Sequence, residues 1–246
     1  MRKALLFIVP FILLFAAGCS ITLHAPDQFS EHGSGRLVSE QRDVSGFDKV
    51  VFGSFGDLSI TQGEQESLII EADDNLLEHI ESNVVNGVLS LGFELNYHFV
   101  LPTHIHYTLV VKDLSSIQLS GVGSVEIGEL HTGSLSMDLS GTGNLTVANL
   151  QADRLNVVIS GLGGVEAAGK VRDLDIHISG AGNFKGGSLH SQTSHIRVSG
   201  LGDATVWVDN SLDVVISGTG GIEYYGRPQI SQTISGLGDL KSLGNK

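Results

Sequence analysis

The chain has few of the residues that several common functions require. It contains 1 cysteine in 246 residues, which excludes an intrachain disulfide framework and any metal site built from several cysteines. It has 14 Lys and Arg residues against 27 Asp and Glu residues, and this net charge of −13 argues against a nucleic-acid binder. Proline is scarce, with 4 residues, whereas 32 glycines are present without the three-residue period of collagen. The 41% of hydrophobic residues exclude a wholly disordered chain and leave ample material for a core.

Residues 1–18 have the composition of an export signal. Two basic residues precede an apolar stretch over 4–15, which Pro10 interrupts and which is short for a transmembrane helix, and small residues follow it. Cys19 comes directly after them, an arrangement that resembles the lipobox of bacterial lipoproteins. We therefore expect a lipoprotein signal peptide and an acylated Cys19 that anchors the mature chain to a membrane. The residue after the cysteine is Ser20, and in this the chain resembles lipoproteins that are sorted to the outer membrane. The alternative is an ordinary secretory signal with an incidental cysteine.

The second half of the chain contains an internal repeat whose common element is Ser-Gly-x-Gly. Seven copies follow one another at spacings of 18 to 20 residues. Such a short and regular period is typical of proteins built from stacked structural repeats. The fourteen motif glycines are Gly121, Gly123, Gly141, Gly143, Gly161, Gly163, Gly180, Gly182, Gly200, Gly202, Gly218, Gly220, Gly236 and Gly238.

Inward and outward residues alternate around each motif. The residues one and three positions before the serine are apolar, as at Ile178 and Ile216, with Gln232 as the exception. The residues between them, such as His177 and Val215, are expected to face outward, and a second apolar column follows five positions after the serine. This period of two predicts strands with one buried face. The motif then forms the corner between two strands, where glycine permits a positive φ.

These strands predict an all-β fold, a parallel β-solenoid with coils of about 18–20 residues. One coil cannot bury its inward face alone, so stacking of coils must complete both the core and the hydrogen bonding. We expect the domain to span 42–246, with irregular β-rich coils over 42–113 capping the regular repeats of 114–246. A short helix is expected within 74–82, and the polar stretch 19–41 is predicted to be a flexible tether.

Three segments of the first half, together with the repeats, resemble a known family. They are GFDKV at 46–50, GDLSITQG at 56–63 and EADDNLL at 71–77. With the repeated Ser-Gly-x-Gly they resemble the head GIN domain proteins over roughly residues 44–240. These are bacterial proteins, often lipoproteins, that are commonly labelled heads of autotransporter adhesins. The resemblance implies a β-helical fold and an exported location, and it supplies no catalytic residues.

One row of polar residues could carry chemistry. Asp175, His195 and Asp213 stand at the same position of three successive coils, so stacking would place them roughly 5 Å apart on the outer surface. A carboxylate–imidazole–carboxylate row could serve polysaccharide cleavage. It could equally be a ladder in which the imidazole separates stacked like charges, which is the interpretation we favour.

Other candidate sites are weaker. His104 and His106 share a strand face near His98, but no third ligand is identifiable, so a solvated strand is expected and no metal. Asp203 and Asp239 follow the second motif glycine, as in calcium-binding solenoids, but only two of seven copies have Asp there. No helical period follows any Gly-x-Gly, so these are not phosphate loops.

The sequence therefore predicts a non-enzymatic lipoprotein of the cell envelope. We expect its repetitive face to bind a glycan or a surface protein in adhesion, without cofactor, metal or nucleic acid. Two alternatives stay open: a carbohydrate-active lyase or hydrolase that uses Asp175, His195 and Asp213, and a purely structural or signalling module of the envelope. The oligomeric state does not follow from the sequence.

Overall fold

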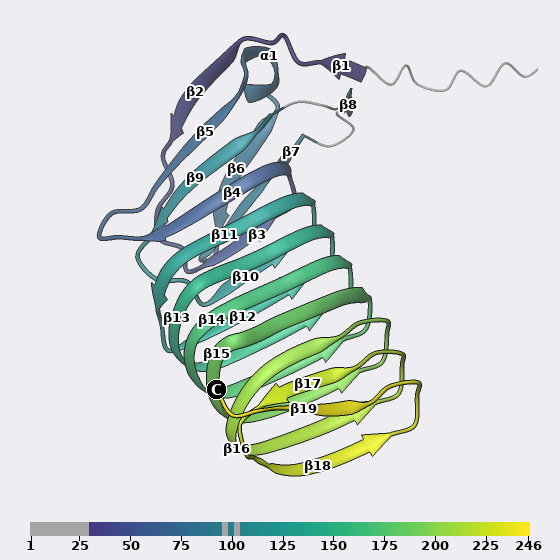
Figure 1. Ribbon diagram of the computed structural model, residues 1–246. Coiled ribbons are helices and arrows are strands. Elements are labelled where there is room, and N and C mark those ends of the chain that lie inside the picture. The colour runs from purple at the N-terminus through teal and green to yellow at the C-terminus, as the bar shows by residue number, and fades with distance from the viewer. Residues whose placement is uncertain (1–29, 95–97, 101–103) are drawn as a thin grey trace, which may run out of the picture.

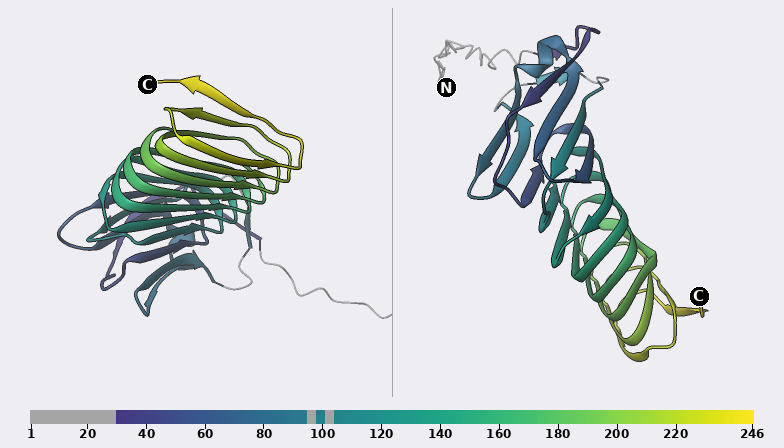
Figure 2. Two further views of the ribbon diagram at one scale, coloured as in Figure 1. Left: turned by 90° about the horizontal axis from the view of Figure 1, so that it is seen from below. Right: turned by 90° about the vertical axis from the view of Figure 1, so that its left-hand side faces the viewer.

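The computed structural model describes residues 30–94, 98–100 and 104–246, in which strands dominate and α1 is the one helix (Figure 1). The strands form coils stacked along one axis, with α1 near one end and β17–β19 at the other (Figure 2). The predicted all-β parallel solenoid is confirmed.

The regular coils stack as parallel strands in register. Met137 of one coil lies opposite Val157 of the next, and Val157 lies opposite Ile176, so each inward column continues from coil to coil. Several strands run on past one face of a coil and into the next, with bulges where they bend. The strands of this part are β10 (Ser116–Leu119), β11 (Val122–His131), β12 (Ser134–Leu139), β13 (Thr142–Ile159), β14 (Leu162–Ile178), β15 (Ala181–Val198), β16 (Ala204–Ile216), β17 (Ile222–Tyr225), β18 (Gln229–Ile234) and β19 (Leu240–Gly244).

The predicted inward columns form one continuous hydrophobic core. Ile178 and Ile216 are both fully buried, and His177 between the strand's buried residues is exposed. The last coil differs, because Ile234 is 38% exposed and Gln232 stands at an inward position. Among the described residues no further coil covers this end, so its inward side chains have a core neighbour on one side only.

The N-terminal part continues the solenoid and adds antiparallel pairing to it. β3 and β4 stack in parallel against β10 and β11, and β7 and β9 stack on their other side. Antiparallel pairs join β2 to β5, β5 to β9 and β6 to β7. The elements of this part are β1 (Ser30–His32), β2 (Leu37–Arg42), β3 (Lys49–Phe52), β4 (Phe55–Gln62), β5 (Ser67–Asp73), α1 (Asp74–Leu77), β6 (Ile80–Val85), β7 (Val88–Phe93), β8 (His98–Val100) and β9 (His106–Val111).

Two local expectations differ from the structure. The predicted tether 19–41 is too long, because β1 pairs with β8 and β2 pairs with β5 within it. The helix expected within 74–82 ends at Leu77, because Ile80 begins β6, which pairs with β7 as a hairpin. In both cases hydrogen bonding to a strand distant in sequence, or across a hairpin, overrides the local composition.

The predicted signal peptide, residues 1–18, and Cys19 lie outside the described residues. Within the described part of the chain, no helix has the length and apolar character needed to cross a membrane.

Candidate functional site

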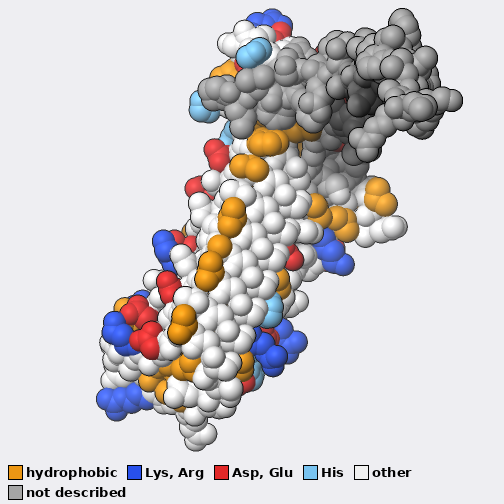
Figure 3. Space-filling view, turned by 90° about the vertical axis from the view of Figure 1, so that its right-hand side faces the viewer, with side chains coloured by type: hydrophobic (Ala, Val, Ile, Leu, Met, Phe, Trp, Pro, Cys, Tyr) orange, Lys and Arg blue, Asp and Glu red, His pale blue; other side chains and the backbone are white. Residues whose placement is uncertain are grey.

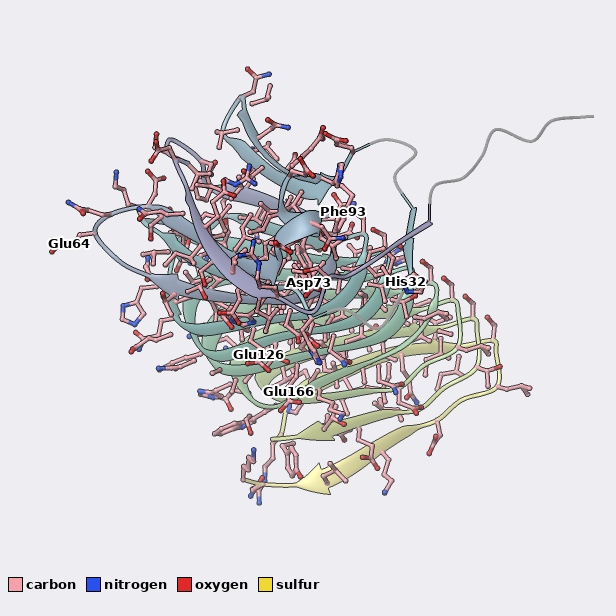
Figure 4. All side chains as sticks on the ribbon, turned by 90° about the horizontal axis from the view of Figure 1, so that it is seen from above. His32, Glu64, Asp73, Phe93, Glu126 and Glu166 are labelled. Atoms are coloured by element: carbon pink, nitrogen blue, oxygen red, sulfur yellow. The ribbon has the colours of Figure 1, made fainter. Side chains whose placement is uncertain are left out.

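Each regular coil presents three surfaces to solvent. The strand before the Ser-Gly-x-Gly motif forms the first face, the motif forms the corner edge, and the strand after it forms the second face (Figure 1). Because neighbouring coils pair in register, outward side chains at equivalent positions stack in columns on each face. Glu126 and Glu166, two coils apart on the second face, lie one below the other in Figure 4.

The structure places all fourteen motif glycines at the corner edge, where successive coils approach most closely. A Cβ added at any of them would lie less than 3.0 Å from backbone atoms of the preceding coil. A positive φ was the expected reason for glycine, yet it holds only at Gly123, Gly143, Gly163 and Gly220. Close stacking of the backbones is the requirement that all fourteen share.

A row of exposed apolar side chains follows the corner edge. The variable residue of the motif is Val122, Leu162, Leu201 or Leu237 in four of the coils, with exposed fractions from 43% to 77%. The space-filling view shows this row on an otherwise uncharged strip of backbone and small side chains (Figure 3). Charged side chains flank the strip rather than interrupting it.

On the first face, the predicted row of Asp175, His195 and Asp213 is assembled in register. His195 Nδ1 lies 3.4 Å from Asp213 Oδ2, and the two side chains are 59% and 41% exposed. A general acid–base pair works in a pocket that excludes water, whereas these groups stand on an open strand face. Their arrangement fits a charge ladder.

A second polar ladder runs beside that row. Thr193 Oγ1 donates a hydrogen bond of 2.8 Å to Asp173 Oδ1, and Arg172 Nε donates one of 3.1 Å to Asp173 Oδ2. These two bonds, together with the positive charges of Arg172 and Arg154, lower the pKa of the Asp173 carboxyl. The carboxyl is partly exposed and ionised, which is the state a surface ladder requires.

The other predicted metal candidates do not converge. His104 and His106 are exposed near the start of β9, and His98 begins β8. Asp203 and Asp239 belong to alternate coils, with Gly221 between them. Within the described part of the chain, no group of three or more His, Cys, Asp or Glu side chains is arranged to hold a metal ion.

The second face has two hollows of similar construction, three coils apart. The upstream hollow surrounds Gly164 and has a volume of about 300 Å³; the downstream hollow surrounds Gly221 and has a volume of about 430 Å³. In each hollow the central coil has a glycine where the two neighbouring coils have Asn or Asp. These neighbours are Asn144 and Asn183 around Gly164, and Asp203 and Asp239 around Gly221. The upstream hollow contains Asn144, Thr146, Gly164, Glu166 and Lys185, and the equivalent downstream residues are Asp203, Thr205, Gly221, Glu223 and Lys241.

The downstream hollow is the more charged of the two. Asp203 Oδ1 accepts a hydrogen bond of 2.6 Å from the Gly221 N–H, and a Cβ on Gly221 would lie 3.2 Å from Asp239 Oδ1. Lys241 Nζ lies 2.8 Å from Glu223 Oε1, and this hydrogen bond and the negative charge of Glu223 raise the pKa of Lys241. Three carboxylates against one ammonium leave the hollow with a net negative charge.

An aromatic pair lies two residues beyond this hollow on the same strands. Trp207 and Tyr225 are register partners in neighbouring coils, and the Lys246 ammonium lies 5.4 Å from the Trp207 ring centroid and 5.1 Å from that of Tyr225. The His190 ring packs on Trp207 with 4.4 Å between centroids. His190 Nε2 lies 2.7 Å from Asp209 Oδ2, which fixes the imidazole and, through it, the indole.

Sequence reasoning missed this aromatic pair. Trp207 and Tyr225 each stand eight positions after the motif serine, so alignment of the repeats could have brought the two together. His190 does not share that position, because bulges between β15 and β16 shift the register. The contact of Lys246 with both rings depends on the path of the chain after β19.

The stacked coils, the narrow glycine edge and the two polar faces define an elongated parallel β-solenoid with repetitive outer surfaces. The chain belongs to the family described as "Putative auto-transporter adhesin, head GIN domain", whose model matches residues 46–228. The resemblance seen in the sequence is thereby confirmed.

Solved structures share the fold. A "putative adhesin" from Bacteroides fragilis is 29% identical, with a TM-score of 0.83, and the match covers 86% of this chain and 99% of the other. A "putative adhesin" from Parabacteroides merdae is 22% identical with a TM-score of 0.68, covering 87% of this chain and 100% of the other. A "putative lipid binding protein" from Parabacteroides distasonis is 22% identical with a TM-score of 0.69, covering 86% and 98%. None of these names is that of an enzyme, and no curated protein matches the chain significantly.

Proposed function

We propose that this protein is a non-enzymatic lipoprotein of the bacterial cell envelope that binds a glycan or a surface protein and thereby supports adhesion. The observation that carries the proposal is the stacking of outward side chains in columns. Strands in register repeat at about 4.8 Å, so equivalent groups recur at regular intervals along the face. A partner that itself repeats can engage several coils at once, which raises its apparent affinity. Membership of an adhesin family supports the same conclusion.

The two kinds of partner suit different surfaces. The second face, with its hydroxyl, amide, carboxylate and ammonium groups, offers hydrogen bonds to a glycan. The corner edge, with its exposed leucines, offers an apolar strip to a protein. Acyl chains on Cys19 would hold both surfaces at the envelope, in our proposal at the outer membrane.

Binding and turnover can be separated in one experiment. The full chain, purified in detergent, is incubated with acidic and neutral envelope polysaccharides and with envelope proteins, and both complex formation and new reducing or unsaturated ends are followed. We expect binding without cleavage. Cleavage that disappears in His195→Ala, while the fold stays intact, would overturn the proposal in favour of a lyase or hydrolase that uses Asp175, His195 and Asp213. If neither binding nor cleavage occurs, the proposal is wrong and a structural module remains.

A further inference from the structure

We propose that the second face at β16, β17 and β19 binds glycans that carry protonated amino groups, with an amine held between Trp207 and Tyr225. This inference rests on the proposed function, since it names the class of glycan and the place where it binds. It joins two observations on neighbouring strands: an aromatic pair whose two rings both contact an ammonium group, and a hollow lined by carboxylates.

The aromatic pair already functions as a cation site within the chain. The Lys246 ammonium lies within about 6 Å of both ring centroids, the range in which a ring face attracts a cation. Two rings in register, one from each neighbouring coil, can both contact one compact ammonium, as they do with Lys246. His190 packs against Trp207 and so supports the indole in that position.

The downstream hollow adjoins the aromatic pair. Thr205 lies two residues before Trp207 on one strand, and Glu223 lies two residues before Tyr225 on the next. Side chains two residues apart on a strand point to the same face and are separated by about 7 Å. A sugar whose amine lies between the rings can therefore reach the hollow with a neighbouring unit. The carboxylates of Asp203 and Asp239 beside Gly221 accept hydrogen bonds, which hydroxyl and ammonium groups donate.

Charge selects among glycans. The downstream hollow has three carboxylates and one lysine, and the whole chain has a net charge of −13. A polyanionic glycan would meet like charge both locally and at long range, whereas an amino glycan meets the opposite charge. The same charges disfavour nucleic acid.

The upstream hollow provides an internal comparison. It repeats the threonine, glutamate and lysine of the downstream hollow, but the positions equivalent to Trp207 and Tyr225 are Ala148 and Ala168. It therefore has the polar groups without the cation site. Only the downstream hollow is expected to bind an amino sugar with measurable affinity.

Lys246 should act as an internal competitor. Its ammonium occupies the position that the ligand amine would take, so binding must displace it. Removing this side chain should tighten binding, whereas removing the indole should weaken it. A merely structural role of the cluster would not produce these opposite effects.

The test uses two probes of the same sugar, one with free amines that carry a positive charge and one with acetylated, uncharged nitrogens. Glucosamine oligomers, in a buffer acidic enough to protonate them, and the N-acetylated oligomers of equal length are titrated calorimetrically into the full chain in detergent. We expect the glucosamine oligomers to bind at least about tenfold more tightly than the acetylated ones. Trp207→Leu should weaken this binding about tenfold, and Lys246→Ala should strengthen it severalfold.

Two glycine variants provide the matched control. Gly221→Asn fills the downstream hollow and Gly164→Asn fills the upstream one, and both coils neighbouring Gly164 accept Asn at this position, as Asn144 and Asn183 show. Gly221→Asn should weaken binding of the glucosamine oligomers, and Gly164→Asn should leave it unchanged. Because neither variant alters a buried side chain, this comparison holds even if Trp207→Leu fails to fold.

Three outcomes would overturn the inference. Equal affinity for the glucosamine oligomers and the acetylated oligomers would show that the protonated amine does not contribute to binding. Tight binding that neither Lys246→Ala nor Gly221→Asn changes would place the glycan elsewhere on the solenoid and leave the proposed function standing. Absence of glucosamine binding, with binding of another glycan, would reject the amino glycan alone, whereas absence of all glycan and protein binding would reject the proposed function too.

Discussion

At the scale of single residues, the corner glycines are required by the neighbouring coil rather than by their own dihedral angles. Ser140 N and Gly141 N both donate to Leu119 O of the preceding coil, and Thr142 N donates to Gly121 O. This continuous backbone ladder brings the chains so close at the corner that a Cβ has no room. The Ser-Gly-x-Gly motif therefore recurs in each coil because each coil must pack closely against the backbone of the one before it.

Replacing a corner glycine should therefore be costly. Gly143→Ala places a Cβ against the Gly123 backbone at a residue whose φ is +147°, and we expect a loss of about 1–3 kcal/mol of folding free energy. The matched control is Gly133→Ala, where no atom lies within 4 Å of the added Cβ and the change should stay within about 0.5 kcal/mol. Urea denaturation of both variants measures the difference. Equal losses would show that glycine stands at the corner for another reason.

Tyr107 is a buried polar group in the N-terminal part of the solenoid. It is fully buried, its hydroxyl lies 2.6 Å from the Oγ of buried Ser54, and its ring meets Phe52 edge-on at 5.2 Å. Burial raises the pKa of the Tyr107 hydroxyl, although the hydrogen bond to Ser54 acts in the other direction. The folded protein therefore retains this proton at a pH where the unfolded chain has lost it.

This raised pKa predicts a loss of stability in alkali. The stabilising contribution is fully present below the unfolded pKa of about 10 and is lost as pH rises above it, by up to about 1.4 kcal/mol per pH unit. Tyr107→Phe should cost about 1–3 kcal/mol at neutral pH, because Ser54 loses its partner, but should then lose less stability between about pH 10 and pH 11. Denaturation midpoints of the native chain and the variant at several pH values check this. Parallel pH profiles would contradict it.

At the scale of elements, the strands are held in place by columns of inward side chains. Ile176 and Ile178 are both buried, and the residue between them is exposed, as the period of two predicts. The N-terminal strands do not all stack in parallel as the regular coils do. The pairs β2–β5, β5–β9 and β6–β7 are antiparallel. Their hydrophobic alternation predicts strands but not their partners.

The register predicts opposite effects for neighbouring residues. Ile178→Asp or Ile216→Asp would bury an unpaired carboxylate and should cost several kcal/mol, a large part of a total stability of about 5–15 kcal/mol. His177→Ser and Val215→Ser change outward side chains and should cost less than about 1 kcal/mol. Chemical denaturation compares the two sets. Equal damage in both would mean that the register is wrong.

At the scale of the whole molecule, the described chain begins at one end of an elongated solenoid. β1, at the start of the described chain, lies at the end of the solenoid opposite β19 (Figure 1). A lipid on Cys19 would therefore hold the protein by this end and leave the regular coils and the aromatic pair farthest from it.

This arrangement depends on acylation of Cys19. We expect the native protein to fractionate with membranes and Cys19→Ser to be released, because two or more acyl chains are needed for stable anchoring. Mass spectrometry of the mature N-terminus should show a lipid-modified cysteine. An unmodified N-terminus at another residue would contradict the prediction.

The sequence by itself determined the class of fold, the period of the coils and the inward columns, because each coil repeats the same local alternation. It also placed Asp175, His195 and Asp213 in one row, since in-register stacking follows from the repeat. Only the tertiary structure decided that β2 joins the sheet and that Trp207 and Tyr225 meet Lys246. Trp207 and Tyr225 share a position of the repeat, but their contact with Lys246 depends on the path of the chain after β19, and a register shift at a bulge brings His190 onto Trp207. Local patterns encode which side of a strand is buried, whereas the meeting of distant side chains depends on how the coils stack and where the chain turns.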